Sequence, residues 1–433
     1  MSAHPKSDQN QAQAGVSELS EKAHRVLPGG TFGNTAANLV IREGQGSHVW
    51  DENGKEYVDY LIGSGPMIIG HSHPDVNAAV QQQLTKGTTF FANNRQGIDL
   101  AAIIVDAVPC ADKVRFASTG SEADAFAMRL ARAYRGRDKI LKFEGGYHGF
   151  SDYGQMSLAP SQPGNTSRPT SDSAGIPDNV RDNMLVAPFN DADAVAGLIR
   201  EHKDSIAAVF MEPLQRLIPP RPGFLEAMRE LTAENDILLV FDEVVTGFRM
   251  SYGGAQAYYG VTPDLCTLGK AIGGGFPLSA IAGSEEVMAL FDRNQTDDEH
   301  FVPQIGTLSG NPVASAAGIA TLNVLNQPGT YESLFANGQK LMDEFTQCLK
   351  SAGVDAQIVG APPLFDVVFA DGEIRNYRDM LRVDKSKLTQ LNALLLERGI
   401  LKGENKSYLS TSLTDADISH TIDAWKEAVP LLA

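Results

Sequence analysis

Short apolar runs alternate with segments of helical periodicity through most of the chain, from about residue 74 to residue 321. The runs KILKF, IAAVFM and ILLVF have the length of buried strands, and the segments between them place apolar residues on one helical face. We therefore expect strands at 139–143, 206–211 and 237–241 and helices at 191–203 and 223–235. Alternation of this kind predicts an α/β fold with a mostly parallel sheet and helices on both faces.

The two ends of the chain follow other patterns. Before residue 74, the stretch HVWDENGKEYVDYL alternates polar and apolar residues around Asn53-Gly54, which predicts a β-hairpin. After about residue 325, the pattern predicts helices at 331–351, 386–398 and 414–429 and strands at 364–369 and 407–411. We divide the chain into a disordered tail (1–20), an N-terminal segment with the hairpin (21–73), a large domain (74–325) and a C-terminal α+β domain (326–433).

Composition narrows the choice of partners and location. The 433 residues include 36 Lys plus Arg against 53 Asp plus Glu, a formal charge of −17. Such an acidic chain has no general affinity for nucleic acid or anionic membranes, so neither partner is expected. The three cysteines lie far apart, and neither a signal peptide nor an apolar run of membrane-spanning length stands in the sequence. These features predict a cytoplasmic protein.

Asp242 and Lys270 are the first candidates for chemistry. Asp242 follows an apolar strand directly, at the edge where open α/β sheets bind ligands, although a helix-capping aspartate would occupy the same place. Lys270 stands between an apolar run and three glycines; it is not a P-loop lysine, because Ala271 replaces the required Ser or Thr. An apolar site would disfavour its ammonium form and make it available for Schiff-base chemistry. The alternative is a loop lysine whose head reaches water.

The start of a helix could bind an anion. Thr119, Gly120 and Ser121 open a strongly periodic helical segment, where free backbone N–H groups meet two hydroxyls. An ordinary N-cap followed by the acidic Glu122 explains the same motif.

Aromatic and histidine residues add one more candidate. In FEGGYHGF, at 143–150, Tyr147 could lie on a flat ring, while a histidine on such a turn, His148, is expected to be structural. The pair His71 and His73 has no cysteine or carboxylate at metal-ligand spacing, so no metal site is predicted.

Together these motifs resemble the class III aminotransferases of the pyridoxal-phosphate (PLP) fold-type I superfamily, and the pattern is most similar to the glutamate-1-semialdehyde aminomutase branch. The segments that carry the resemblance are DYLIGSGPMIIGHSHP (59–74), STGSEA (118–123), FEGGYHGF (143–150), SDSAGIP (171–177), MEPLQ (211–215), FDEVVTGFR (241–249), GGAQAYYGVTPDLCTLGKAIGGGFP (253–277) and GTLSGNP (306–312). The resemblance implies a PLP-binding large domain and a smaller α+β domain formed by the N-terminal segment and the C-terminal part.

The resemblance also implies roles for individual residues. Lys270 would form the Schiff base with PLP and move the proton, Asp242 would keep the pyridine nitrogen protonated, and Tyr147 would stack on the ring. Thr307 would reach the phosphate of the neighbouring subunit's cofactor, which implies a homodimer. The other members of the implied cofactor-binding set are Thr119, Gly120 and Ser121 at the phosphate, Val244 on the second ring face, Gln215 at the phenolic oxygen, and His148 and Glu212.

Departures from the aminomutase pattern favour an intermolecular transaminase. Ser64 replaces the family's tryptophan in G-S-W-G-P-M, no arginine follows PGG, and Gln215 resembles the glutamine of intermolecular class III enzymes. The predicted function is amino-group transfer from an amino acid or amine donor to an oxo-acid acceptor by a ping-pong mechanism, of EC 2.6.1 type, with pyridoxamine phosphate as the intermediate cofactor form. An aminomutase of EC 5.4.3 type, an epimerase and an inactive member that binds PLP or a partner are the alternatives.

The substrate contacts are the last expectation. A donor carboxylate needs a cation, and the candidates are Arg216, directly after Gln215, and Lys402 and Lys406 in ILKGENKSYLS. Each could instead be a solvated surface charge. Ser64 would leave room above the cofactor, and the loop at 151–177 is expected to close over the substrate.

Overall fold

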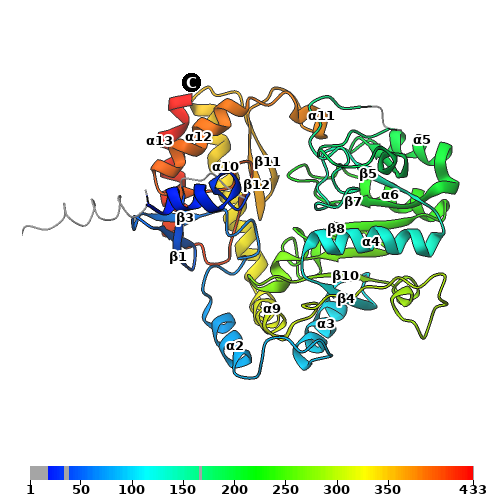
Figure 1. Ribbon diagram of the computed structural model, residues 1–433. Helices are drawn as coiled ribbons and strands as arrows, with labels where there is room; N and C mark the ends of the chain where they lie inside the picture. Colours follow the sequence, from blue (N-terminus) through cyan, green and yellow to red (C-terminus); the bar gives the residue numbers. More distant parts are fainter. Residues whose placement is uncertain (1–17, 34–38, 165–167, 433) are drawn as a thin grey trace, which may run out of the picture.

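The computed structural model describes residues 18–33, 39–164 and 168–432. Figure 1 shows a large domain around a central sheet and, beside it, a smaller domain where the N-terminal strands lie next to the C-terminal helices. Most of the predicted tail at 1–20 lies outside the described residues. The prediction is wrong for residues 18–20, which are helical, as are the residues that follow to position 26. Glutamates in this helix stand four residues before basic residues, a spacing at which opposite charges support a helix.

The central sheet has seven strands in the order β4-β10-β9-β8-β7-β5-β6. Their bounds are Lys113–Ala117 (β4), Lys139–Phe143 (β5), Met184–Ala187 (β6), Ile206–Met211 (β7), Leu238–Glu243 (β8), Leu265–Leu268 (β9) and Ser279–Gly283 (β10). The neighbouring pairs from β9 to β6 are parallel, and β10 runs antiparallel to both β9 and β4. The mostly parallel sheet predicted from the sequence is confirmed.

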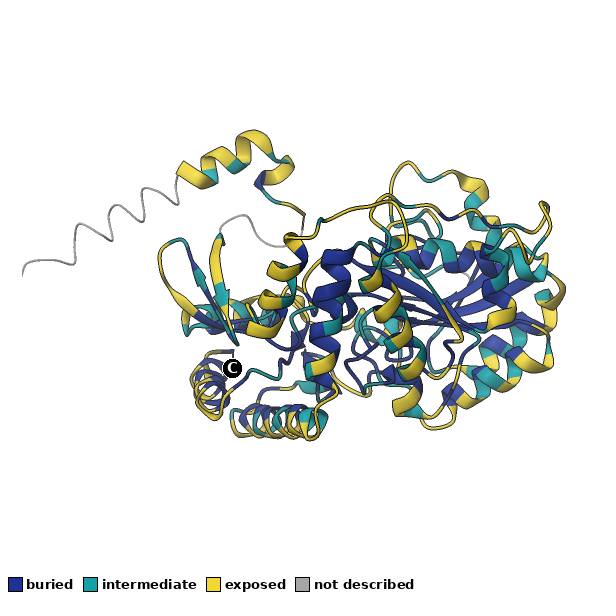
Figure 2. Cartoon of the chain, turned by 90° about the horizontal axis from the view of Figure 1, so that it is seen from below, coloured by how far each residue is buried: buried dark blue, intermediate teal, exposed yellow. Residues whose placement is uncertain are grey.

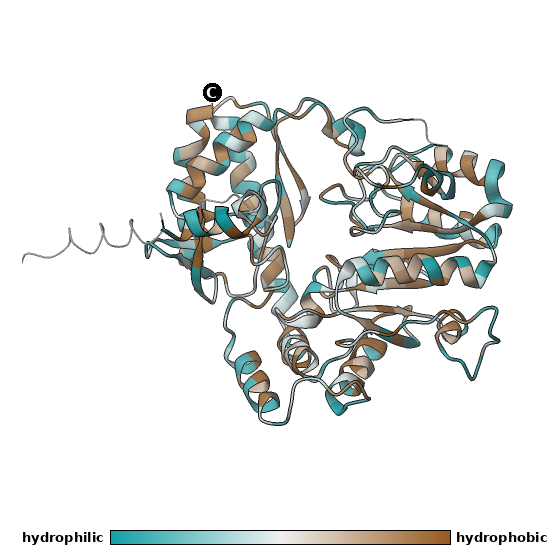
Figure 3. Ribbon diagram, viewed as in Figure 1, coloured by the Kyte–Doolittle hydropathy of each residue, from teal (hydrophilic) through white to brown (hydrophobic). Residues whose placement is uncertain are grey.

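Side chains of the central strands alternate between two buried faces. In β7, Ala208 and Phe210 belong to the core under α4 (Gly120–Arg135), whereas Val209 and Met211 belong to the core that includes α5 (Ala192–His202) and α6 (Phe224–Glu234). Figure 2 shows the strands buried between helices whose outer sides are exposed, and Figure 3 shows the same strands as apolar. Strands that are covered on both faces need unbroken apolar runs, which is why the sequence reveals them.

The remaining helices of the large domain lie around these layers. They are α2 (Pro74–Leu84), α3 (Arg95–Ala107), α7 (Gly254–Tyr259), α8 (Glu285–Met288) and α9 (Pro312–Leu325), with 3-10 turns at Asp178–Asn183, Lys203–Ser205, Lys270–Gly273 and Ala289–Phe291. Helix α9 packs against α2 and α3. Within the described part of the chain, no helix has both the length and the apolar character that crossing a membrane requires.

The smaller domain joins both ends of the chain. One sheet contains β1 (Ile41–Gln45), β2 (His48–Asp51), β3 (Glu56–Asp59) and β13 (Ile400–Leu401), and a second contains β11 (Gln357–Ala361), β12 (Leu364–Val368) and β14 (Ser407–Tyr408). The helices are α10 (Thr330–Ser351), α12 (Lys385–Glu397) and α13 (Asp415–Ala428), with 3-10 turns at Pro28–Gly30 and Val429–Leu432. Because β2 and β3 pair antiparallel, the predicted hairpin is confirmed. The parallel pairing of β13 with β3 ties the C-terminal part to the N-terminal segment.

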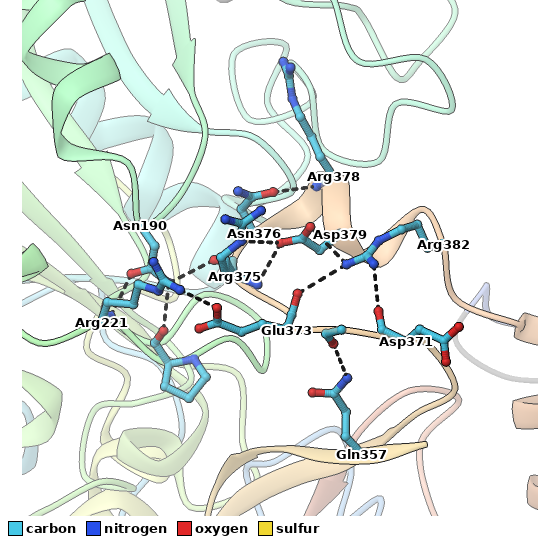
Figure 4. Close-up of polar contacts among 12 residues, drawn as sticks. Asn190, Arg221, Gln357, Asp371, Glu373, Arg375, Asn376, Arg378, Asp379 and Arg382 are labelled. Atoms are coloured by element: carbon cyan, nitrogen blue, oxygen red, sulfur yellow. Dashed lines mark hydrogen bonds and ion pairs between the residues drawn. The ribbon is translucent and has the colours of Figure 1, made fainter. Parts of the chain in front are cut away.

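Residues 371–383, which we call the bridge segment, reach from the smaller domain to the large one; Figure 1 shows its short helix α11 (Tyr377–Met380) beside the large domain. Figure 4 shows polar contacts that involve Asn190, Arg221, Glu373, Arg375, Asp379 and Arg382. Nε of Arg378 donates to the buried Glu144 carboxylate at 2.7 Å, and the Tyr377 hydroxyl donates to the Pro160 carbonyl at 3.1 Å. The bridge segment therefore contacts the turn at 143–150 and the loop at 151–177.

Candidate active site

Polar side chains replace apolar ones at the carboxyl ends of adjacent strands, on the face of the sheet that α4 covers. Asp242 in β8 is paired with Thr267 in β9, and Glu212 directly follows β7. The residues that precede them on this face belong to the apolar core under α4: Phe210, Val240 and Leu265. The polar side chains therefore stand side by side at the edge where open α/β sheets bind ligands.

Asp242 is buried, and both of its carboxylate oxygens are engaged. Oδ2 lies 2.7 Å from Nδ1 of His148, and Oδ1 accepts from the backbone N–H of Val244 at 3.1 Å. His148 is fully buried and packs edge-on against Phe210 at 4.9 Å between ring centroids, so its role is to hold Asp242. Turns follow β8 where a capping aspartate would begin a helix. Helix capping therefore does not explain Asp242.

Lys270 follows β9 closely and is the first residue of a 3-10 turn, with a left-handed φ of 48°. Burial lowers the pKa of its ammonium, an effect that the Asp242 carboxylate opposes and that Arg249 and Arg216 reinforce. A buried lysine with a lowered pKa holds more of the neutral amine that attacks carbonyl carbons. The surroundings of Lys270 thus favour Schiff-base chemistry over a solvated loop lysine.

The turn at 143–150 brings Tyr147 close to the start of α4. Position 149 requires glycine, because its φ is 76° and a Cβ there would lie 2.5 Å from the Cα of Ser121. The backbone N–H of Phe150 donates to Oγ of Ser121 at 3.3 Å. Glycine at this position therefore lets the aromatic turn pack onto the helix start.

Lys142 hydrogen-bonds this turn and the loop that follows it. The sequence analysis did not identify this residue. Its side chain is fully buried and donates to the carbonyl oxygens of Gly146, Gly154 and Met156 at 2.7 to 3.2 Å. Burial lowers the pKa of Lys142 to about 8, although neighbouring carboxylates such as Glu212 oppose the shift. The only signal for it was a lysine inside the apolar run KILKF.

The N-cap interpretation of the helix start is confirmed. The Thr119 hydroxyl accepts from the Glu122 backbone N–H at 3.2 Å, and the Glu122 carboxylate accepts from the Thr119 backbone N–H, which is a capping box. Among the described residues, the N–H groups of Gly120 and Ser121 have no acceptor. These two groups at the positive end of α4 are therefore available to an anion, and the anion site stays a prediction.

The residues present fit PLP at each end of that molecule. Gln215 donates from Nε2 to the Glu144 carbonyl at 2.7 Å, and its buried Oε1 has no partner within the described residues, so it can accept from a phenolic hydroxyl. Gly120 lets the Val244 side chain pack against the start of α4, since a Cβ at position 120 would lie 3.0 Å from that side chain. With Asp242 for a ring nitrogen and Gly120 and Ser121 for a phosphate, the polar groups of PLP each have a partner.

Arg216 directly follows Gln215 in a tight turn. Gln215 and Ile218 exchange two backbone hydrogen bonds of 2.8 and 3.0 Å, so Arg216 is the first central residue of a two-residue turn. Its φ is 59°, a conformation for which such turns prefer Gly, Asn or Asp. The guanidinium lies 5.4 Å from the centroid of the Tyr147 ring. An arginine held in a glycine conformation indicates a requirement for the side chain.

Lys406 and Ser64 border the same region. Lys406 is 6% exposed; burial lowers its pKa well below the usual value, and the charge of Arg216 adds to the shift while Glu212 opposes it. Ser64 is exposed and hydrogen-bonds Tyr408, whose ring flanks Gly65 together with the Lys270 stem. The solvated-charge alternative is wrong for Lys406.

Two predicted site residues are not brought to this region. Lys402 forms a buried ion pair with Asp366 at 2.7 Å, so it is neither a substrate cation nor a solvated charge. Its partner Asp366 lies in β12. No pattern in the sequence linked Asp366 to Lys402. Thr307 is exposed and lines a separate hollow of about 470 Å³ with Phe90 and Phe91.

Sequence reasoning also missed Asp124 and Arg249. Asp124 lies on the buried stripe of α4, where an acidic residue between Ala123 and Ala127 was the available signal. Arg249 is fully buried and donates to the carbonyl oxygens of Gly65, Pro363 and Leu409, which joins both domains beside the site. Among the described residues, no group of three or more His, Cys, Asp or Glu side chains is arranged to hold a metal ion.

The chain is similar to known proteins in sequence and fold. The family model described as aminotransferase class-III matches residues 31–397. An omega-transaminase from Sphaerobacter thermophilus is 36% identical, with a TM-score of 0.91 over 96% of this chain and 97% of the other. A β-phenylalanine aminotransferase from Variovorax paradoxus is 32% identical, with a TM-score of 0.85 over 96% and 94%. A glutamate-1-semialdehyde aminomutase from Pseudomonas aeruginosa has a TM-score of 0.87 over 99% and 97% at 23% identity, a likeness of fold alone.

Proposed function

The chain belongs to the class III aminotransferase family and is a PLP-dependent transaminase, and we propose that it uses Lys270 to transfer an amino group from an amino acid to an oxo acid. The observation that carries this proposal is the buried group formed by Lys270, Asp242 and His148 at the carboxyl edge of the sheet. PLP supplies an aldehyde that condenses with primary amines and a ring that accepts the electron pair from the substrate Cα.

The chain's own residues divide the remaining tasks. Asp242, held by His148 and the Val244 N–H, would hold the proton on the ring nitrogen. Lys270 Nζ would take the proton from the substrate Cα and return it at the cofactor carbon that receives the amino group. Tyr147 and Val244 would position the ring between them, and Gln215 would orient it through the phenolic oxygen. The loop at 151–177 would exclude water.

Arg216 supports a donor or acceptor that carries a carboxylate. The chain as a whole is acidic, yet this guanidinium lies 5.4 Å from the centroid of the Tyr147 ring. Arginine presents a planar fork of donors that matches both oxygens of a carboxylate. We therefore assign the carboxylate to Arg216, and we assign no charge-carrying role to Lys406, because burial lowers its pKa well below the usual value.

The test is a titration of the PLP-loaded protein with α-, β- and ω-amino donors and glutamate-1-semialdehyde, without an acceptor. We expect one carboxylate-bearing donor class to change the visible spectrum of the cofactor completely and to release one equivalent of oxo product. Conversion of the semialdehyde to 5-aminolevulinate as the only reaction would establish the aminomutase alternative. Inversion of configuration at the amine carbon of the donor, without release of an oxo product, would establish an epimerase. If no donor changed the spectrum, the protein would be an inactive PLP-binding protein.

Arg216→Gly should separate substrate binding from stability. Removing the guanidinium should raise the KM for carboxylate-bearing donors about 10- to 100-fold, the range expected for a lost hydrogen bond to a charged group. The melting temperature should not fall, because glycine adopts a φ of 59° without strain. Arg221→Gly is the control for loss of charge, because Arg221 is exposed and pairs with Glu373 of the bridge segment. An unchanged KM would exclude Arg216 from carboxylate binding.

We also propose a homodimer in which Thr307 contributes to the partner's cofactor site. Apolar side chains that are between 50% and 79% exposed surround the hollow near Thr307; they are Phe90, Phe91, Ile98 and Ile305. A group of large apolar side chains that are exposed together is typical of a protein interface. Light scattering should give twice the chain mass of 46.5 kDa, and Ile305→Lys should give the single-chain mass and weaker PLP binding. Leu381→Lys on the bridge segment is the control, and a monomeric wild type would contradict the dimer.

The cytoplasm remains the proposed location. The three cysteines are free, buried thiols. Free thiols are typical of a reducing compartment. Fractionation of the source cells tests this location. Recovery of the protein outside the cytoplasmic fraction would contradict it.

A further inference from the structure

Asp124 is a buried carboxyl group that none of the roles above uses. It is 2% exposed and lies on the face of α4 that packs against the sheet. Its Oδ1 lies 2.7 Å from the Thr267 hydroxyl, and the same hydroxyl lies 3.4 Å from Oδ1 of Asp242. A single threonine hydroxyl thus stands between two buried carboxyl groups.

The charges around Asp124 come from each neighbouring element. Asp242 lies on β8 and Glu212 after β7, while the cation Lys142 lies on β5, and Tyr147 is on the aromatic turn. Among the described residues, Asp124 has no salt-bridge partner within 4.0 Å. Burial raises the pKa of Asp124 well above its usual value; the negative charges of Asp242 and Glu212 add to this, and the Thr267 hydrogen bond opposes it.

We propose that Asp124 is a neutral, protonated positioning residue for Asp242, an inference that rests on the proposed role of Asp242 at the cofactor ring nitrogen. The Asp124 carboxyl O–H donates to Oγ1 of Thr267, and the Thr267 O–H donates to Oδ1 of Asp242. In this order every proton has one acceptor, whereas two ionised carboxylates would compete for the single threonine proton.

This arrangement gives Asp242 three fixed neighbours. His148 holds Oδ2, and the Val244 N–H and the Thr267 hydroxyl hold Oδ1. Donors to a carboxylate stabilise its ionised form, and a neutral Asp124 avoids a second buried negative charge beside it. Asp124 therefore keeps the Asp242 carboxyl group oriented without contacting the cofactor.

The pH dependence of stability in the protein without PLP tests the protonation of Asp124. A carboxyl group whose pKa is raised in the folded state contributes stability that is lost as pH rises from about 4 toward the folded pKa. Asn at position 124 removes this loss. The melting temperature of Asp124→Asn minus that of the wild type should therefore rise by about 2 °C or more between about pH 4.5 and about pH 8.

Asp379→Asn is the matched control for this experiment. Partial burial opposes ionisation of Asp379, but hydrogen bonds from Arg375 and the positive charges of Arg375 and Arg382 outweigh it and lower its pKa. Its variant should be less stable than the wild type by a difference that stays flat across the same pH range. A flat or falling difference for Asp124→Asn would overturn the proposal, because Asp124 would then be ionised in the folded protein.

PLP affinity tests the link to Asp242. Asp124→Ala should raise the Kd for PLP about tenfold, and Asp124→Asn, which keeps a neutral donor, should stay within about twofold of the wild type. Equal losses in both variants, or none in Asp124→Ala, would overturn the positioning role. A wild type that binds no PLP would contradict the proposed function instead, while the pH experiment on the unloaded protein would still decide the protonation of Asp124.

Discussion

Lys270→Ala should reduce transaminase turnover by at least about 10,000-fold, because the variant loses both the amine that attacks the cofactor aldehyde and the base for the Cα proton. Burial and the positive charges of Arg249 and Arg216 lower the pKa of the Lys270 ammonium, although the Asp242 carboxylate opposes the shift. PLP should still bind, since the groups assigned to its phosphate and ring remain. Steady-state turnover and PLP affinity of the purified variant measure the two effects.

Two further measurements sharpen this expectation. Lys385→Ala removes an exposed lysine at the start of α12 and should keep wild-type turnover. Borohydride treatment of the PLP-loaded wild type should attach the cofactor to the peptide that contains Lys270, and the alanine variant should lose this label. Substantial turnover in Lys270→Ala, or a label on another lysine, would contradict the assignment.

Asp242→Asn should lower turnover about 1,000-fold, the upper range for removal of one electrostatic stabiliser of a transition state. Asparagine keeps the shape and one acceptor oxygen but loses the negative charge that would hold the ring-nitrogen proton. The amide would also meet His148, which lies 2.7 Å from Oδ2. Single-turnover rates with an amino donor, followed by cofactor absorbance, measure the loss at the chemical step.

Asp264→Asn is a suitable control, since this aspartate pairs with Arg229 and receives the Leu239 N–H outside the site. It should affect stability and leave the single-turnover rate unchanged. A rate for Asp242→Asn within about tenfold of the wild type would show that the ring nitrogen does not depend on this carboxylate.

The sequence was sufficient for three strands of the central sheet and for the hairpin. Buried strands require continuous apolar runs, so the patterns of β5, β7 and β8 were clear, and the Asn53-Gly54 turn marked the hairpin. Asp242 stands at the end of one of these apolar runs, which predicts its place at the ligand-binding edge, and the structure has it near the end of β8.

The pattern of apolar and polar residues could not predict contacts between segments that are distant in the sequence. The sequence analysis proposed Lys402 as a substrate cation because it could not show that Lys402 pairs with Asp366. The two residues are 36 positions apart in the chain, and Asp366 lies on β12. Asp124 and Lys142 are single polar residues within apolar stretches, and only the packing of α4 and the aromatic turn shows what they contact. The 18–20 prediction failed because polar composition alone does not exclude a helix.

The left-handed backbone of Arg216 makes this position a practical place to redesign the substrate range. Glycine, asparagine and aspartate are the residues that adopt this conformation at least cost. Replacing Arg216 by each in turn would vary the local charge from positive through neutral to negative on an unchanged backbone turn. Amines without a carboxylate, or donors with a second amino group, could then be selected without altering the residues that hold the cofactor.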